Sequence, residues 1–455
     1  MEIIETINSA VNNIIWGPYM LCLLLGTGIF FSIKLRFFQI THFKFWWKET
    51  AMSFFKSNNT GTGSKGKISP FQAMSTALAG SIGTGNIVGV ANAVALGGAG
   101  AVFWMWIASV FGMATIYAEN VLGIKYRTKR NGKYVGGPMY YIEKGLHCKP
   151  LAVIFAVLCT LAALGMGNMT QANSAAGAAQ NCFGIPPWVS GAVLTAAVGL
   201  IIFGGIDRIA KLTEKLIPLI SVVFTSMVMI VILINFQKIP AAFENMFVEA
   251  FDLKCVSGGL MGYGMSRALK YGISRGVFSN EAGLGSSPIV HSAADTDSAY
   301  RQGMWGMFQV FIDTTVLCTL MALCILTTNS EQSGLDGIEL SIYTFESALG
   351  SIGGIFLSLS ILIFAFATLV SWCYYGEKSL EYLSGDRYIR IYRIIYSLVT
   401  FVGCTMNLSL VWEISDTLNG LMAIPNLIAI VLLSGKIKYS DVIQYKNTLR
   451  NPKRV

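Results

Sequence analysis

Two segments of this chain place glycines and polar side chains inside otherwise apolar sequence. The first, at 75–89, reads STALAGSIGTGNIVG, and the second, at 276–288, reads GVFSNEAGLGSSP. Glycine costs about 1 kcal/mol in a helix interior and proline about 3 kcal/mol, so we expect both segments to interrupt a helix. Close helix packing through small residues is the alternative. Packing accounts for the glycines of the first segment, but not for Asn280, Glu281 and Pro288 in the second.

An interrupted helix exposes backbone groups that can bind ligands. Its second half begins with free N–H groups, which attract a carboxylate, and its first half ends with free C=O groups, which attract a small cation. In the first segment we expect the backbone from Gly80 to Gly83 to face a cation. We expect a carboxylate to meet the N–H groups of Gly83, Thr84, Gly85 and Asn86. This arrangement suits the cation-coupled uptake of a zwitterion.

Polar side chains on two other apolar segments are candidates to complete this site. One segment reads GNMTQAN over 167–173 and offers Gln171. The other carries Thr368 and Trp372, which are four residues apart and therefore share a helix face. The functional interpretation is a hydroxyl beside the cation and an indole that limits pocket size. The structural alternative is a threonine bonded to its own i−4 carbonyl and a tryptophan at the membrane interface.

Acidic residues lie within apolar segments, where an ionisable side chain indicates function by default. Glu281 lies in the second interrupted segment, and Asp313 and Glu119 lie in two others. Each is a candidate proton relay or cation ligand. Structural roles are favoured for Glu119, as the partner of a cytoplasmic base such as Arg127, and for Glu281, as a cap of the second half-helix. No partner is predicted for Asp313.

These segments are positioned by helices that cross a membrane. Of the 455 residues, 54% are apolar and 13% are charged, which is about half the charge of a soluble domain. This composition excludes a soluble enzyme, a disordered chain and a disulfide-stapled secreted domain. Stretches of 18 or more apolar residues can span a bilayer, and we predict eleven spans, at 14–33, 70–95, 101–124, 151–181, 187–205, 212–235, 257–292, 303–328, 352–376, 391–408 and 411–434.

The predicted spans form a single membrane transport domain, 1–455. An extra N-terminal helix with a cytoplasmic loop (1–67) precedes two blocks of five spans, at 68–235 and 257–434, and a cytoplasmic tail (435–455) follows. With five spans each, the two blocks must face opposite ways in the membrane. Each block also begins with an interrupted span, which is the inverted-repeat plan of secondary transporters.

The distribution of basic residues predicts the orientation. If the spans alternate, 28 of the 33 Lys and Arg residues fall on one side. Basic residues near spans stay cytoplasmic, so we expect the N-terminus outside and the C-terminus in the cytoplasm. The net charge of +9 therefore reflects topology, because the chain lacks the groove-reading and stacking elements typical of nucleic-acid binding. Glu2 and Glu5 in place of a basic n-region indicate that the first span is an uncleaved helix.

Other patterns that suggest chemistry are weaker. The stretch 61–68 resembles a phosphate-binding loop but has isoleucine where serine or threonine should follow the lysine. Ser286 and His291 hint at a hydrolase, yet no orienting carboxylate can be assigned to them. A disulfide between Cys182 and Cys255 has no support from spacing. The three histidines are far apart and show no metal-ligand spacing.

One long motif resembles a known family. The segment 97–112, GGAGAVFWMWIASVFG, resembles the defining motif of the alanine/glycine:cation symporter family, the sodium:alanine symporters. Four further blocks resemble the same family: SPFQA at 69–73, GTGN at 83–86, GGPMYY at 136–141 and NEAGLGS at 280–286.

The resemblance implies an all-α integral membrane fold with about eleven transmembrane helices. These form a leucine-transporter-like 5+5 inverted repeat, with one helix added at the N-terminus. The resemblance also implies substrate contacts by Thr84, Gly85, Gln171, Phe278 and Trp372. It further implies sodium ligation by the backbone from Gly80 to Gly83 and by the hydroxyl of Thr368.

We therefore expect a symporter of the cytoplasmic membrane, not an enzyme. Na⁺ is the expected co-transported ion, and alanine or glycine is the expected substrate, with Phe278 and Trp372 restricting its side chain to hydrogen or methyl. No nucleic-acid partner and no obligate protein partner is expected. The alternatives are a proton-coupled or other small-solute transporter of the same fold, a channel, and an intramembrane hydrolase. The two broken helices argue against a channel.

Overall fold

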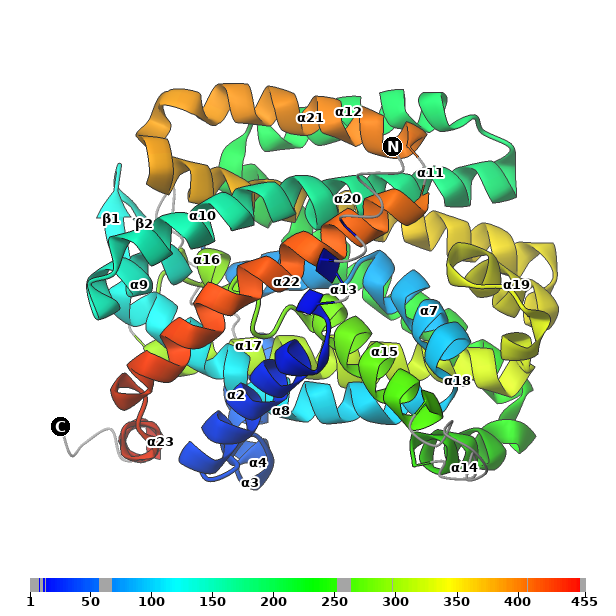
Figure 1. The fold of residues 1–455 in the computed structure, drawn as a ribbon, viewed down its shortest axis with the longest axis horizontal. Helices are drawn as coiled ribbons and strands as arrows, with labels where there is room; N and C mark the ends of the chain where they lie inside the picture. The colour runs from blue at the N-terminus through cyan, green and yellow to red at the C-terminus, as the bar shows by residue number, and fades with distance from the viewer. Residues whose placement is uncertain are drawn as a thin grey trace.

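The computed structural model describes residues 8, 11–12, 14–56, 68–251, 263–296, 298–406 and 408–450, and this part of the chain is nearly all helical (Figure 1). Within these residues one antiparallel hairpin pairs β1 (Thr128–Arg130) with β2 (Lys133–Val135). The stretch that resembles a phosphate-binding loop and the potential disulfide partner Cys255 lie outside the described residues, except Ile68.

The first interrupted segment is a bent helix pair. Helix α6 (Pro70–Ser81) begins with a capping box in which Ser69 and Gln72 satisfy each other's backbone N–H groups. The 3-10 turn η1 (Thr84–Asn86) follows, and helix α7 (Val88–Gly97) then leaves at an angle of 57° to the first half. The predicted break is confirmed, and it falls at the glycine-rich stretch.

The second interrupted segment also breaks. Helix α15 (Tyr263–Asn280) ends at the polar cluster. The short helix α16 (Ser287–His291) begins seven residues later, with Pro288 as its second residue. Between them, Gly283 and Gly285 adopt φ values of +93° and +81°, which favour glycine, and Glu281 adopts +60°. The loop therefore has a left-handed backbone that a continuous helix cannot have.

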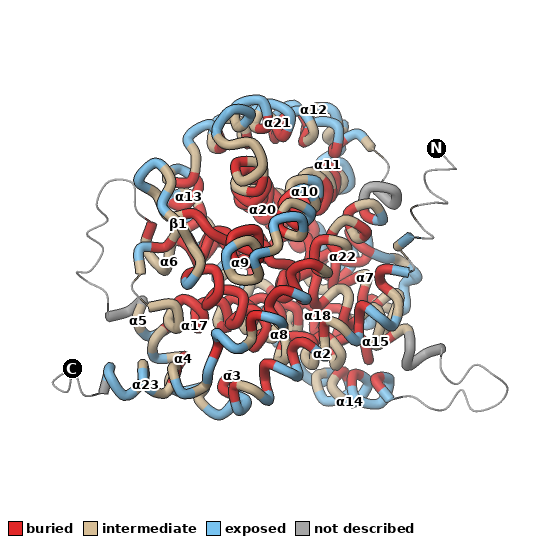
Figure 2. Tube along the Cα trace, turned by 60° about the vertical axis from the view of Figure 1, so that its left-hand side comes forward, coloured by how far each residue is buried: buried red, intermediate tan, exposed pale blue. Residues whose placement is uncertain are grey.

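Long helices hold the two breaks in place. Helix α8 (Gly100–Tyr126) packs against α15 and against α17 (Ala299–Val310), and its residues from Met113 to Ile124 are all buried. Helix α20 (Ser351–Ser384) packs against α6, α10 (Lys149–Leu164) and α11 (Thr170–Phe183). Figure 2 shows that the buried residues concentrate along these central helices, while the outer faces of α12 and α21 are exposed.

Two π-helical segments widen central helices beside the breaks. The segment η2 (Gly165–Met169) joins α10 to α11, and η4 (Phe311–Cys318) joins α17 to α18 (Thr319–Thr328). The remaining helices are α2 (Pro18–Lys34), α3 (Phe38–Thr41), α4 (Phe43–Glu49), α5 (Ala51–Lys56), α9 (Pro138–Leu146), α12 (Pro187–Ile202), α13 (Gly205–Ile234), α14 (Ile239–Ala250), α19 (Gly337–Leu349), α21 (Ile389–Thr405), α22 (Leu408–Leu432) and α23 (Tyr439–Arg450), with 3-10 turns at 236–238, 330–333, 385–388 and 433–436.

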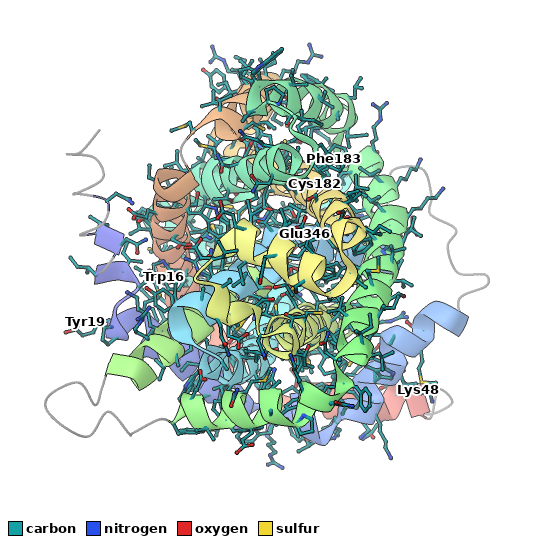
Figure 3. The ribbon with its side chains drawn as sticks, turned by 90° about the vertical axis from the view of Figure 1, so that its right-hand side faces the viewer. Trp16, Tyr19, Lys48, Cys182, Phe183 and Glu346 are labelled. Atoms are coloured by element: carbon teal, nitrogen blue, oxygen red, sulfur yellow. The ribbon has the colours of Figure 1, made fainter. Side chains whose placement is uncertain are left out.

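Helices lie at the ranges where spans were predicted. In the described part of the chain, six helical stretches are long and apolar enough to cross a membrane, and the bent pair α6–α7 makes a seventh if it counts as one span. Helices α2 and α12 are apolar but shorter, at 17 and 16 residues. The helices between spans, such as α9, α14 and α19, and the β1–β2 hairpin were not predicted from the sequence. Figure 3 shows the N-terminal helix, with Trp16 and Tyr19, along one side of the molecule.

Candidate substrate and cation site

The two breaks meet at the centre of the molecule. A Cβ atom added to Gly85 in the first break would lie 3.4 Å from Cδ1 of Phe278 at the end of α15. The predicted site residues on α11 and α20, Gln171 and Thr368, also reach the first break, as described below. All predicted site side chains are at most 3% exposed, so the site is buried inside the molecule.

Thr368 closes the carbonyl end of the first break. Its hydroxyl lies 2.9 Å from the carbonyl oxygen of Ala79 and 3.5 Å from that of Ile82. It also lies 3.0 Å from the carbonyl oxygen of Phe364, four residues earlier, so the i−4 bond of the structural alternative is present as well. A Cβ atom at Gly83 would lie 2.5 Å from Oγ1 of Thr368. Glycine at this position is thus what lets the hydroxyl approach the backbone.

Gln171 caps the N–H end of the first break. Its side-chain oxygen, Oε1, accepts from the backbone N–H of Thr84 at 3.2 Å and from the Thr84 hydroxyl at 3.0 Å. The amide of Gln171 therefore occupies the place where a substrate carboxylate was predicted to bind. The π-helical segment η2 ends two residues before Gln171. Its Gly167 leaves room for Trp372, since a Cβ atom there would lie 2.3 Å from Cβ of Trp372.

Trp372 contacts both breaks. Its indole N–H points to the carbonyl oxygen of Gly80, 3.2 Å away, and to Oε1 of Glu281, 2.9 Å away. Trp372 is fully buried, so its predicted alternative place at the membrane interface is wrong. The Ser286 hydroxyl donates to Oε2 of Glu281 at 2.5 Å. Glu281 therefore connects its own loop to α20. It was expected to cap α16, and it does not.

The structure supplies the partners that the sequence could not assign to Asp313. The side-chain amide of Asn86 donates to Oδ1 of Asp313 at 3.0 Å. The hydroxyls of Ser279 and Thr314 donate to Oδ2 at 2.7 and 2.8 Å. Asn86 was predicted to offer its backbone to a carboxylate, but its side chain joins the first break to η4. Sequence reasoning missed Ser279, although it lies inside the second interrupted segment.

Glu119 has a different partner from the one expected. Asn426 on α22 donates to Oε1 of Glu119 and, at 2.9 Å, to the carbonyl oxygen of Gly283 in the second break. The expected pairing of Glu119 with Arg127 is therefore wrong. Arg127 instead donates to three backbone carbonyls that follow α16, at residues 292, 294 and 296, at distances of 2.6 to 3.3 Å.

A charged pair covers the opposite end of the site, and sequence reasoning missed it. Arg275 on α15 and Asp416 on α22 form a salt bridge of 3.0 Å, with both side chains less than a fifth exposed. The Arg275 guanidinium also lies 5.6 and 5.4 Å from the rings of Phe278 and Trp412, which stack 5.2 Å apart. The signal in the sequence was a basic residue and an acidic residue, each inside a predicted span.

The hydrolase alternative lacks its required geometry. A serine nucleophile needs its base within hydrogen-bond reach, but Ser286 and His291 do not contact each other, and the Ser286 hydroxyl donates to Glu281. His291 instead contacts the side chains of Gln302, at 2.5 Å, and Gln309, at 3.4 Å.

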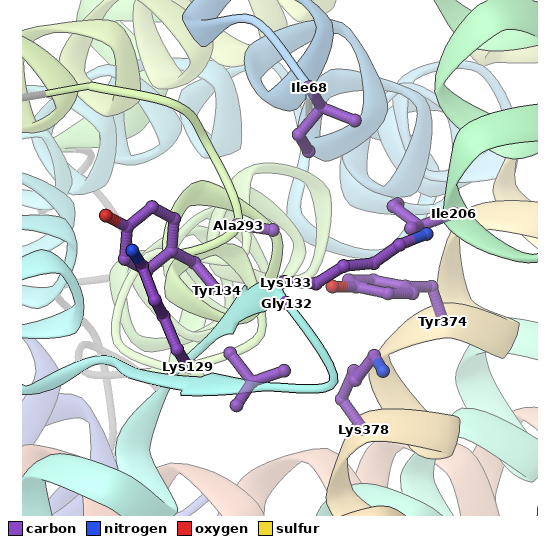
Figure 4. A pocket seen from close by; sticks show the side chains of 10 residues that line it. Ile68, Lys129, Gly132, Lys133, Tyr134, Ile206, Ala293, Tyr374 and Lys378 are labelled. Carbon is purple, nitrogen blue, oxygen red and sulfur yellow. The ribbon is translucent and has the colours of Figure 1, made fainter. Parts of the chain in front are cut away.

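A small pocket lies towards the C-terminal end of α20, near Lys378 and away from the predicted site (Figure 4). It opens between the β1–β2 hairpin, the start of α6 and α20, where Tyr374 and Lys378 line it together with Ile68, Tyr134 and Lys133. Tyr374 follows Thr368 by six residues, or about 9 Å along a helix. The pocket contains none of the predicted site residues.

A multi-helix membrane architecture with two broken helices facing each other, and polar side chains converging on both, defines a class of protein: the secondary transporters. The sequence profile of the sodium:alanine symporter family matches residues 1–454. The chain belongs to this family, and it is a transporter rather than an enzyme.

Individual relatives agree with this assignment. The chain is 46% identical to the sodium/alanine symporter AgcS of Methanococcus maripaludis over 446 residues, which cover 96% of each chain. Among solved structures, a variant of the manganese transporter of Eremococcus coleocola superposes with a TM-score of 0.51 at 14% identity, covering 80% of this chain and 76% of that one. A Na⁺-coupled sialic acid symporter superposes with a TM-score of 0.50 at 14% identity, covering 92% and 86%. These two structures share the fold.

Proposed function

We propose that this protein is a sodium-coupled symporter that takes up alanine and glycine by alternating access. The observation that carries the proposal is the approach of the Thr368 hydroxyl to the carbonyl oxygen of Ala79, at 2.9 Å, where α6 ends. Unwound carbonyls at the end of a half-helix coordinate Na⁺ in transporters built this way. The backbone from Gly80 to Gly83 and the hydroxyl of Thr368 are the proposed sodium ligands.

The amino acid is proposed to bind next to the ion. Its carboxylate would meet the N–H groups of Thr84, Gly85 and Asn86, where the amide of Gln171 now accepts from Thr84. Gln171 would then turn its NH₂ group towards that carboxylate. Phe278, which packs against Gly85 from the second break, and Trp372 are proposed to leave room for only a hydrogen or a methyl group.

Sodium would both drive uptake and bind before the amino acid. Each 100 mV of membrane potential contributes about 2.3 kcal/mol for every positive charge that enters. Bound sodium would neutralise the carbonyl end of the first break and stabilise its unwound form. The N–H groups on the other side of the break are then already arranged when the amino acid arrives.

The proposed architecture has eleven transmembrane helices, with two inverted repeats at 68–235 and 257–434 after one extra helix. The N-terminus is proposed to be outside and the C-terminus cytoplasmic. Contacts among the basic segments support this orientation, since the hairpin residues Lys133 and Arg130 pair with Asp207 and Glu381, at 2.8 and 3.8 Å. Lys125 likewise pairs with Asp441 of the C-terminal helix at 3.9 Å. The basic segments therefore lie on one face, as the positive-inside rule requires.

Alternating access would require each end of the site to open in turn. The Arg275–Asp416 pair above the Phe278–Trp412 stack is proposed to close the outer side. Arg127, which holds the three carbonyls after α16, is proposed to close the inner side. The structure then corresponds to the state in which both ends are closed.

Uptake of radiolabelled alanine into proteoliposomes tests the proposal. Uptake should require sodium rather than choline outside, and glycine should compete better than serine or leucine. A pH gradient imposed in choline separates the proton-coupled alternative. Uptake that follows the pH gradient without sodium would overturn the proposed coupling, and conductance without accumulation would indicate a channel.

A further inference from the structure

A groove runs along one edge of the molecule. The residues that line it are not those of the proposed transport site. The groove lies between helices α3 and α4, which follow the first apolar helix, and the C-terminal helix α23, and these helices occupy the same edge in Figure 2. The groove has a volume of about 620 Å³, and its lining consists of Ile40, Thr41, His42, Phe43, Lys44, Phe45, Lys48, Glu49, Lys446 and Leu449.

The groove is positively charged. Three lysines, Lys44, Lys48 and Lys446, line it, against the single carboxylate of Glu49. Partial burial, and then the charge of Lys446, lower the pKa of His42. Lys48 projects from this edge beside α23 in Figure 3. An anion is therefore the ligand that the groove favours.

The rim of the same groove is apolar. Ile40, Phe43 and Leu449 are 58%, 40% and 45% exposed, although all are large hydrophobic residues. Ile40 and Phe43 follow shortly after α2, which ends at Lys34, so they lie where a membrane-spanning helix would leave the bilayer. Leu449 lies next to them on α23. Aromatic and basic residues on one short helix are typical of the membrane–water interface. A small inorganic anion would leave this apolar rim uncovered.

We propose that the groove binds an anionic phospholipid. The phosphate and headgroup lie between Lys44, Lys48 and Lys446, and the acyl chains cover Ile40, Phe43 and Leu449. The inference concerns a surface separate from the transport site and does not depend on which amino acid is carried.

The aromatic packing beneath the groove gives the lipid a route to transport. Phe43 and Trp46 lie 5.8 and 5.9 Å, ring to ring, from Phe311, the first residue of η4. Outside the groove lining, the Arg36 guanidinium lies 5.0 Å from the ring of Tyr439 on α23 and connects this helix to the segment before α3. A lipid that bridges α4 and α23 would therefore stabilise the helix that carries Asp313.

Native mass spectrometry of the full-length protein with phosphatidylglycerol tests this proposal. We expect retained phosphatidylglycerol, with a preference over phosphatidylcholine, and a raised thermal unfolding temperature. Replacing the groove lysines together (Lys44→Gln, Lys48→Gln, Lys446→Gln) should weaken retention by about fivefold for each lysine removed. The charge-conserving triple variant (Lys44→Arg, Lys48→Arg, Lys446→Arg) should retain the lipid. This result would separate loss of charge from misfolding.

A control variant removes the same charge elsewhere on the proposed cytoplasmic side, at the exposed Lys149, Lys211 and Lys215. It should bind phosphatidylglycerol as the wild type does. Equal losses in the control and groove variants would overturn the proposal, because the lipid would then be attracted by overall charge. Equal stabilisation by inorganic phosphate or by an acidic peptide, without lipid, would also overturn it.

Discussion

The indole nitrogen of Trp372 lies 2.9 Å from Oε1 of Glu281, and the same N–H points to the carbonyl oxygen of Gly80, 3.2 Å away. One side chain of α20 thus connects the loop of the second break to the end of the first half-helix. Because Trp372 and Glu281 are both fully buried, neither group can replace this contact with water. The two breaks are therefore mechanically joined through α20.

Trp372→Phe should remove the hydrogen bonds that connect the two breaks. The variant keeps an aromatic ring but leaves Glu281 without one of its donors, which costs about 1–3 kcal/mol. We expect a lower unfolding temperature and a loss of sodium-driven alanine uptake. Trp188→Phe is the matched control, because Trp188 is 62% exposed, and it should change neither quantity. Wild-type uptake and stability in Trp372→Phe would contradict the joined-break interpretation.

Gly83→Ala should abolish uptake. The added methyl would lie 2.5 Å from Oγ1 of Thr368 and 2.9 Å from Oε1 of Gln171, so both side chains that meet the first break would be displaced. Gly89→Ala, at the second residue of α7, meets no atom within 4 Å and should transport normally. Its helix should gain up to about 1 kcal/mol of stability. Equal uptake by the two variants would argue against a tight site at Gly83.

Thr368→Ala should weaken the response to sodium more than the maximal rate. Removing one oxygen ligand should weaken sodium binding by about 1.5 kcal/mol, which raises the half-saturating sodium concentration about tenfold. Alanine uptake measured across a sodium titration gives this concentration. Thr368→Ser retains the hydroxyl and should behave nearly as the wild type. The account fails here if the alanine and serine variants show the same sodium dependence as the wild type.

The Arg275–Asp416 pair should act as a unit. In a double-mutant cycle of Arg275→Gln and Asp416→Asn, measured by thermal unfolding, we expect a coupling free energy of about 0.5–3 kcal/mol. The Lys133–Asp207 pair is the control, since both its side chains are 42% exposed. Exposed pairs couple by about 0.2–1 kcal/mol. If the coupling free energy of Arg275 and Asp416 is no larger than that of the control pair, the proposal that this pair closes the outer side is wrong.

The sequence predicted the helix breaks because their cause is local. Glycines around Gly83 and the Asn280–Pro288 stretch disfavour helix wherever they occur, so the breaks could be located without any tertiary information. Thr368 and Gln171 were found because hydroxyl and amide side chains are conspicuous in apolar spans. The structure places both against the first break, at the distances given above.

Contacts between helices far apart in the chain could not be predicted in the same way. Asp313 and Asn86 are separated by 227 residues, and Arg275 and Asp416 by 141. No local pattern identifies such partners, and Glu119 was accordingly assigned a cytoplasmic base such as Arg127, when its partner is Asn426 on α22. The helices outside the predicted spans, such as α19, were missed because amphipathic segments between spans do not stand out by hydropathy.

Equilibrium binding to the purified protein tests the central claim, that one broken helix binds the ion and the amino acid together, most directly. Linkage requires that sodium raise the affinity for alanine by the same factor by which alanine raises the affinity for sodium. By isothermal titration calorimetry we expect this factor to be about tenfold or more, equal in both directions, and close to one in Thr368→Ala. Alanine binding of the same affinity in sodium and in choline would contradict the account.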